Sequence, residues 1–124
     1  MKKKLYTSIS LMWAIAIVHF SLSSVPTGPS ISNFDKLGHC AAYMVLAFFL
    51  SLSLREWGLG VWGIIITLII CAFLGGGLEI VQSRVGRAME LADFAADMAG
   101  AVLGLLTFRL VSLIALKTMK RHRK

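Results

Sequence analysis

Charged side chains, and acidic ones above all, are scarce in this chain. Of its 124 residues, six are Asp or Glu, 15% are charged and 57% are hydrophobic. A soluble chain this short would leave too much of that apolar surface exposed to water. The composition therefore excludes an ordinary small soluble domain. It predicts an integral membrane protein made of one domain, residues 1–124.

Cysteine and proline are also rare, with two of each. Cys40 lies near the start of one apolar run and Cys71 in the middle of another, so their depths should differ by about 10 Å. That separation exceeds the reach of a disulfide, and both cysteines are expected to be small packing residues. Both prolines fall in residues 25–34, where together with a glycine they predict a loop.

Hydrophobic runs long enough to cross a membrane, which takes roughly 20 residues, occur four times. The expected helices cover about residues 5–24, 35–54, 59–82 and 92–116, with a tight turn at 55–58 and a polar loop at 83–91. The first run follows a lysine triplet, as a signal peptide does, but its length favours a retained helix. We therefore expect an all-α integral membrane four-helix bundle.

Basic residues predict the orientation of this bundle. The net charge of +7 is concentrated at the two chain ends, without the basic groove-reading face that nucleic-acid binding requires. Both ends and Arg55 share one side, against Lys36, Arg84 and Arg87 opposite. The positive-inside rule then predicts that both termini are cytoplasmic, in a multi-pass protein of the cell inner (cytoplasmic) membrane.

Polar side chains at helical spacing fall on the opposite side from the termini. They form three stripes: Asp35, His39 and Tyr43; Glu79 and Gln82; Asp93 and Asp97. Lipid disfavours such groups, so the three stripes are expected to point at one another. Gly100 and Gly104 continue the last stripe, and we expect them to serve close packing within the bundle rather than a dimer.

Two of the carboxylates need partners on physical grounds. Glu79 lies near a helix C-terminus, where the helix dipole disfavours an anion. Its expected donors are Lys36, His39, Arg84 and Arg87. Asp97 lies about one helical turn deeper than the start of its helix and must be hydrogen-bonded, paired or protonated.

The chemistry of the stripes leaves several functions open. They could form a structural lock between helices, a ligand site, or an acid–base site for a lipid-linked substrate. His39, Glu79, Asp93 and Asp97 could hold a divalent cation, but no zinc-type spacing supports this, so no metal or cofactor is expected. A transporter is disfavoured because the polar residues gather at one end.

Four elements follow one another in a specific order and spacing: Asp35-Lys36-x-x-His39-x-x-x-Tyr43, Glu79-x-x-Gln82, Gly86-Arg87, and Asp93-x-x-Ala96-Asp97-x-x-Gly100-x-x-x-Gly104. Together they resemble the VanZ-like membrane proteins, over about residues 20–106. The resemblance implies a cell-envelope protein. The founding members are associated with low-level resistance to glycopeptides, teicoplanin above all, and most relatives have no defined activity. Many relatives have Asn in place of Asp97, and an aromatic residue where Met89 stands.

The leading hypothesis is a VanZ-like envelope protein that binds or modifies a ligand at an outer-leaflet polar site. The candidate catalytic residues are Asp35, His39, Glu79, Asp93 and Asp97. The candidate binding residues are Lys36, Tyr43, Gln82 and Arg87. The expected partners are membrane lipids and an envelope lipid or polymer, whose phosphate Lys36 and Arg87 would contact, and no nucleic acid. The alternatives are a membrane enzyme acting on a lipid-linked envelope substrate and a structural protein with a polar helix lock.

Overall fold

Four long helices make up almost all of the described chain. The structure is a computed structural model that describes residues 1–23, 32–84 and 90–121. Its helices are α1 (Lys2–Ser23), α2 (Ser32–Glu56), α3 (Gly60–Arg84) and α4 (Leu91–Arg121), and the described residues contain no strand. All four are long and apolar enough to cross a membrane. The predicted all-α membrane architecture is confirmed.

The helix bounds follow the predicted ones closely, except at the end of α4. This helix continues to Arg121, beyond the expected end near residue 116. The added turn carries Lys117 and Lys120, and lysine favours a helix about as well as leucine or methionine does. The predicted end was placed where the apolar run stops, whereas the helix continues into the basic residues that follow.

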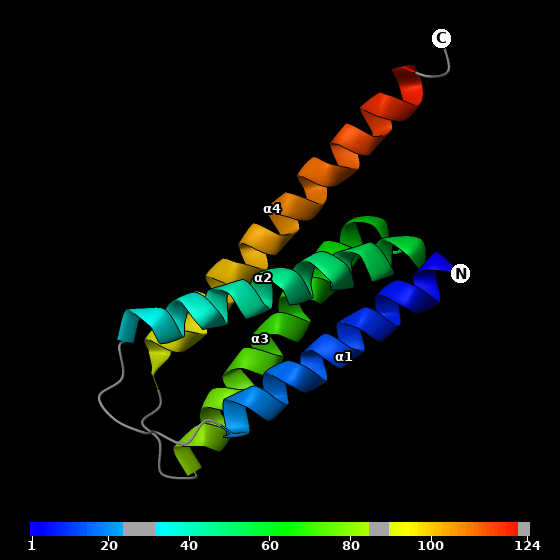
Figure 1. Ribbon diagram of the computed structural model, residues 1–124. Coiled ribbons are helices and arrows are strands. Elements are labelled where there is room, and N and C mark those ends of the chain that lie inside the picture. Colours follow the sequence, from blue (N-terminus) through cyan, green and yellow to red (C-terminus); the bar gives the residue numbers. More distant parts are fainter. Residues whose placement is uncertain (24–31, 85–89, 122–124) are drawn as a thin grey trace.

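The central helix of the bundle is α2. It packs against α1 and α4, and α3 contacts all three, whereas α1 and α4 make no close backbone approach to each other. Since α1 and α3 run antiparallel to α2, while α4 runs parallel to it, the starts of α2 and α4 meet the ends of α1 and α3 (Figure 1). We call this the site end. The N-terminus and the later part of α4 lie at the opposite end, which we call the basic end.

A tight turn joins α2 to α3 at the basic end, as predicted. The Gly58 N–H donates to the Arg55 carbonyl at 2.9 Å, and Gly58 has a φ of 79°. That left-handed conformation ends helices and favours glycine because other residues pay a steric cost there. The chain thus reverses direction within a few residues, which sets α3 antiparallel to α2.

Two glycines bring α4 against α2. A Cβ atom added to Gly100 would overlap the Cys40 carbonyl, and one added to Gly104 would overlap the Met44 carbonyl. The two pairs advance by four residues on each helix, so α2 and α4 touch along parallel stripes. The G-x-x-x-G pair therefore serves packing within the chain, as expected.

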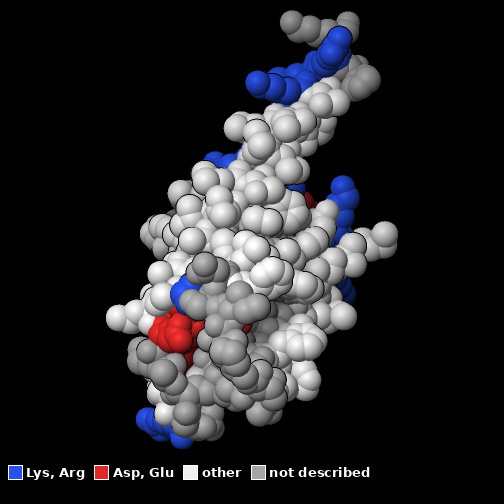
Figure 2. Space-filling model, turned by 60° about the vertical axis from the view of Figure 1, so that its left-hand side comes forward, with Lys and Arg blue, Asp and Glu red and all other residues white. Residues whose placement is uncertain are grey.

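The bundle has a narrow core and a broad apolar surface. The largest fully buried side chains are Tyr43, Leu46, Thr67, Asp97 and Cys71, while large apolar side chains are exposed on all four helices. Such a surface suits lipid rather than water. Both cysteines are free, as expected. Figure 2 shows basic side chains on the projecting tip of α4 and acidic side chains gathered toward the other end.

Candidate functional site

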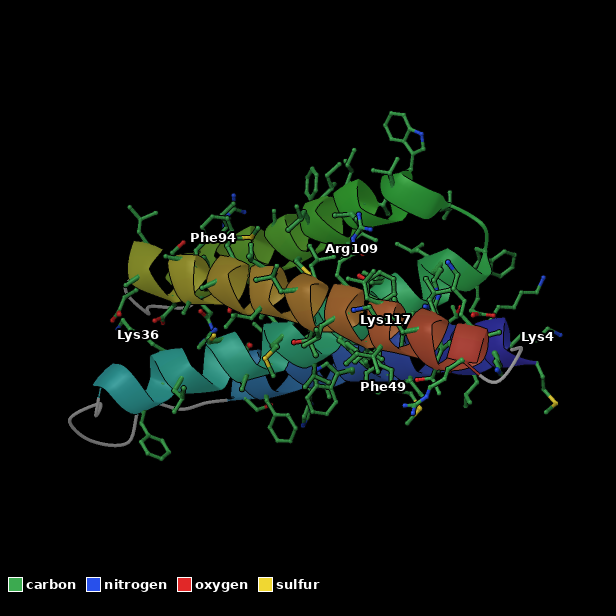
Figure 3. The ribbon with its side chains drawn as sticks, turned by 90° about the horizontal axis from the view of Figure 1, so that it is seen from above. Lys4, Lys36, Phe49, Phe94, Arg109 and Lys117 are labelled. Carbon is green, nitrogen blue, oxygen red and sulfur yellow. The ribbon has the colours of Figure 1, made fainter. Side chains whose placement is uncertain are left out.

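The polar cluster lies at the site end, where the three predicted stripes converge. We use this name for the polar side chains and one loop carboxylate that meet there. Its members are Asp35, Lys36, His39 and Tyr43 of α2, Glu79 and Gln82 of α3, Glu90 before α4, and Asp93 and Asp97 of α4. Figure 3 places Lys36 and Phe94 at this end and Lys4 and Lys117 at the other. Arg87, also predicted for the site, lies outside the described residues.

The shortest contact between α2 and α4 side chains in the cluster joins His39 to Asp97. The Nδ1 of His39 lies 2.9 Å from Oδ1 of Asp97, whose residue is only 2% exposed. The expectation that Asp97 must be paired or hydrogen-bonded is confirmed. Gly75 of α3 makes room for this carboxylate, because a Cβ there would lie 2.8 Å from Asp97 Oδ2. The absence of a side chain in α3 thus lets a buried acid of α4 reach α2.

A second bridge between α2 and α4 is formed by Lys36. Its Nζ lies 3.3 Å from Oε2 of Glu90 and 3.6 Å from Oδ1 of Asp93. The Asp93 oxygen is buried and has no hydrogen-bond partner among the described residues. The ammonium group is too far from it for a hydrogen bond and supplies only charge.

Glu79 was expected to accept a hydrogen bond from a cationic side chain. Among the described residues this expectation is wrong, because its donor is main chain. Oε2 of Glu79 accepts a hydrogen bond of 3.0 Å from the backbone N–H of Glu90. A main-chain donor is available because Glu90, just before α4, lies beside the end of α3. Gln82 is bonded to main chain as well: its Nε2 donates to the Ser21 carbonyl at 2.9 Å, tying α3 to the end of α1.

The hydroxyl of Tyr43 is buried at the bottom of the cluster. The residue is 1% exposed, and its oxygen has no hydrogen-bond partner among the described residues. A Cβ on Gly75 would lie 3.4 Å from it, so this hydroxyl and the Asp97 carboxylate approach the same point of α3. A buried phenol normally finds a partner, so a ligand oxygen at this depth would supply one.

A cavity of about 250 Å³ lies between α1 and α2 next to the cluster. We call it the α1–α2 pocket. Its α1 wall consists of Trp13, Ala16, Ile17, Phe20 and Ser21. Its α2 wall consists of Phe34, Asp35, Gly38, His39, Ala42 and Tyr43. The pocket thus joins an aromatic, apolar wall to three members of the polar cluster, and its volume is close to the lower end of the range for ligand pockets, about 300 Å³.

A family model described as VanZ/LLP1 matches residues 3–112. The chain belongs to the VanZ/LLP1 family. The match confirms the resemblance found in the sequence and extends it over α1, which the motifs had not covered. Comparisons with curated proteins and with solved structures give no significant match.

Within the described part of this VanZ/LLP1 chain, one group of side chains could hold a metal ion. Asp35, His39 and Asp93 each offer one ligand atom, and these atoms lie within 4.8 Å of one another. This combination differs from the one considered from the sequence, which included Glu79 and Asp97. Those two carboxylates instead accept hydrogen bonds from the Glu90 backbone and from His39.

Sequence reasoning missed two contributors to this VanZ/LLP1 site. The sequence places Glu90 in a loop away from the stripes, yet it pairs with Lys36 and donates its N–H to Glu79. Trp13 suits a membrane interface by residue type, yet its Nε1–H donates to the Ala42 carbonyl at 2.9 Å and its ring lines the pocket. Its position in the middle of an apolar run was the available signal, since an indole N–H in the apolar part of a membrane needs an acceptor.

Proposed function

We propose that this VanZ/LLP1 protein binds a lipid-linked ligand of the cell envelope, with the lipid chain in the α1–α2 pocket and the head group at the polar cluster. The observation that carries the proposal is the composition of the pocket wall. Trp13, Phe20 and Phe34 supply apolar surface, while Asp35 and His39 line the same pocket. A ligand with one apolar and one polar part fits such a cavity better than a wholly polar ligand does.

The apolar part of the ligand would enter from the membrane. Phe20 and Phe34 are both in the pocket wall and largely exposed on the helix surface. The wall is therefore continuous with surface that lipid would cover. The cavity of about 250 Å³ suits a segment of a single chain rather than a bulky ring system.

The polar part of the ligand would meet groups of both kinds. Lys36 supplies a cation near the start of α2, Tyr43 a buried hydroxyl, and Asp35 an exposed carboxylate in the first turn. A phosphate would favour the Lys36 side, and sugar hydroxyls would favour the carboxylates. Arg87 remains a proposed anion contact on sequence grounds.

We further propose that both termini face the cytoplasm, so that the site end opens on the outer leaflet of the cell inner membrane. The basic end carries Lys2, Lys3, Lys4, Arg55 and the lysines of late α4, which the positive-inside rule assigns to the cytoplasm. A ligand at the site end would then be an outward-facing envelope lipid.

Labelling of single cysteines tests this orientation. With Cys40 and Cys71 replaced by alanine, Phe34→Cys and Trp57→Cys each place one exposed thiol at opposite ends of α2. In cells with an intact cytoplasmic membrane, a membrane-impermeant maleimide should label Phe34→Cys. It should label Trp57→Cys only after permeabilisation. The reverse pattern would place the polar cluster in the cytoplasm and contradict the proposal.

Filling the pocket tests the proposed ligand site. Ala16→Phe adds an aromatic ring inside the pocket wall, and Ala41→Phe adds the same ring to an exposed position of α2. The added ring occupies space that the lipid chain would need, so Ala16→Phe should weaken ligand binding roughly tenfold, or by about 1.4 kcal/mol, while Ala41→Phe leaves it unchanged. The measurement is photocrosslinking of a diazirine-tagged polyprenyl phosphate, with the crosslinked residues mapped by mass spectrometry.

Two competitors control this experiment. Untagged polyprenyl phosphate should suppress crosslinking more strongly than polyprenol of the same length, because only the phosphate engages the polar cluster. Equal crosslinking of Ala16→Phe and Ala41→Phe would contradict binding in the pocket.

In a sensitive Gram-positive host, we propose that the parent protects against teicoplanin and that Ala16→Phe does not. Equal susceptibility with and without the parent, at measured membrane levels, would refute that resistance link alone.

A further inference from the structure

We infer that Asp35, His39 and Asp93 bind a divalent metal cation beside the α1–α2 pocket. One ligand atom of each lies within 4.8 Å of the other two, a spacing that a small closure of the side chains brings into a coordination sphere. The residues come from two helices, α2 and α4, which the glycines of α4 hold in close contact. The inference concerns the polar cluster itself and does not depend on the proposed lipid ligand.

The hydrogen bond of His39 prepares its ring for a metal. Its Nδ1 lies 2.9 Å from Oδ1 of Asp97. In the neutral imidazole, Nδ1–H donates to that carboxylate, so Nε2 keeps its lone pair for a cation. Metal-binding histidines commonly donate their other N–H to a carboxylate, which fixes the ring and raises the basicity of the ligating nitrogen. Asp97 is therefore a positioning residue in this arrangement.

The buried oxygen of Asp93 needs a partner that a cation would supply. Asp93 is 9% exposed, and its Oδ1 has no hydrogen bond among the described residues. Lys36 lies 3.6 Å from that oxygen but 3.3 Å from Glu90. The lysine can therefore keep Glu90 as its partner while a metal takes Asp93. A buried polar atom without a hydrogen bond calls for such an explanation.

The charge balance at the site end also favours a cation. Five of the six acidic residues of the chain lie there: Asp35, Glu79, Glu90, Asp93 and Asp97. The described basic residues toward this end are His19, Lys36, His39 and Arg84, the last in the exposed final turn of α3. Carboxylates this close together are repelled by one another at neutral pH, and a divalent ion offsets that repulsion.

Two carboxylates and one imidazole are a ligand set for Mn²⁺, Fe²⁺ or Zn²⁺, and they leave coordination positions open. Such an open position can take water or an oxygen of a bound ligand. The set is less suited to Ca²⁺, which takes six to eight oxygen ligands. We therefore choose Mn²⁺ as the probe, because its free form is measured directly by electron paramagnetic resonance.

Manganese binding to the full chain tests the inference. The protein is placed in nanodiscs of zwitterionic lipid, stripped with a chelator and titrated with Mn²⁺, and the decrease of the free Mn²⁺ signal gives the bound amount. The parent should bind about one saturable ion per chain. Asp35→Asn and His39→Gln should each weaken binding at least tenfold, because one of three ligands is lost.

Glu56→Gln is the control, since it removes an acid at the basic end, outside the polar cluster. It should keep the affinity of the parent. Asp35 is exposed, so Asp35→Asn keeps the inference testable even where a change at the more buried Asp93 prevents folding. Equal weakening by Glu56→Gln and Asp35→Asn would mean that Mn²⁺ is attracted by the acidic residues of the chain in general rather than bound by the three ligands. That result, or the absence of saturable binding, would overturn the inference.

Discussion

The Gly100→Ala variant should give far less folded protein than the parent, although the change adds a single methyl group. The new Cβ would overlap the Cys40 carbonyl, and its nearest three neighbours are all backbone atoms of that residue. A side chain can rotate away from such a contact, but a helix backbone can only shift as a whole. The axes of α2 and α4 would have to separate along their entire shared stripe, which also carries Gly104 against Met44.

The expected loss exceeds an ordinary overpacking cost of about 1–3 kcal/mol, because the obstacle is main chain. Purified Gly100→Ala protein should have a lower midpoint of thermal unfolding than the parent. Size-exclusion chromatography in detergent measures the fraction that stays folded after heating. Gly77→Ala is the matched control: nothing lies within 4 Å of its added Cβ, and alanine favours helix over glycine by about 1 kcal/mol. Similar midpoints for Gly100→Ala and Gly77→Ala would contradict the described packing of α2 on α4.

Asp97→Leu is expected to have the second large effect. Leucine has the same branching at Cγ and is somewhat larger, but it removes the acceptor of His39, whose side chain is 20% exposed. Removing one partner of a buried ionic pair typically costs about 3–5 kcal/mol. Asp35→Leu, at an exposed position of the same cluster, should stay within about 0.5 kcal/mol of the parent. Thermal unfolding in the same detergent measures both.

Asp97→Asn separates the structural lock from a working site. The amide oxygen of asparagine can still accept the hydrogen bond from His39 Nδ1–H, so the fold should persist, in keeping with the asparagine of many VanZ-like relatives. A stable Asp97→Asn protein with weakened Mn²⁺ binding would show that the charge of Asp97 serves the site. An unfolded Asp97→Asn protein would instead assign the pair to the lock alone.

The sequence predicted the helices and the end of the bundle at which the polar side chains gather, because both depend on short-range spacing. Four apolar runs required four spans, and the spacing of Asp35, His39 and Tyr43 put them on one helix face. The convergence of three helices followed from their alternating direction. These inferences needed no distance between helices.

The partners of each side chain could not be predicted, because they depend on how the helices touch. His39 pairs with Asp97 rather than another acid because Gly75 and Gly100 let α4 sit deep between α2 and α3. Glu79 takes a main-chain donor that no side-chain inventory contains. The pocket could not be predicted because it needs Trp13 and Phe20 of α1, a helix that carries none of the sequence motifs.

The weak attachment of α1 separates access to the pocket from the integrity of the bundle. Only Ser10 and Ile17 of this helix are buried, whereas α4 buries seven residues. The energy needed to displace an element grows with the contacts it loses, so α1 is the helix that can move away at the lowest cost. Such a motion would widen one wall of the pocket while the α2–α4 contact, and with it the His39–Asp97 pair, stays closed. The α2–α4 contact is thus the most extensive one in the bundle, whereas α1 is the helix whose displacement would open the pocket at the lowest cost.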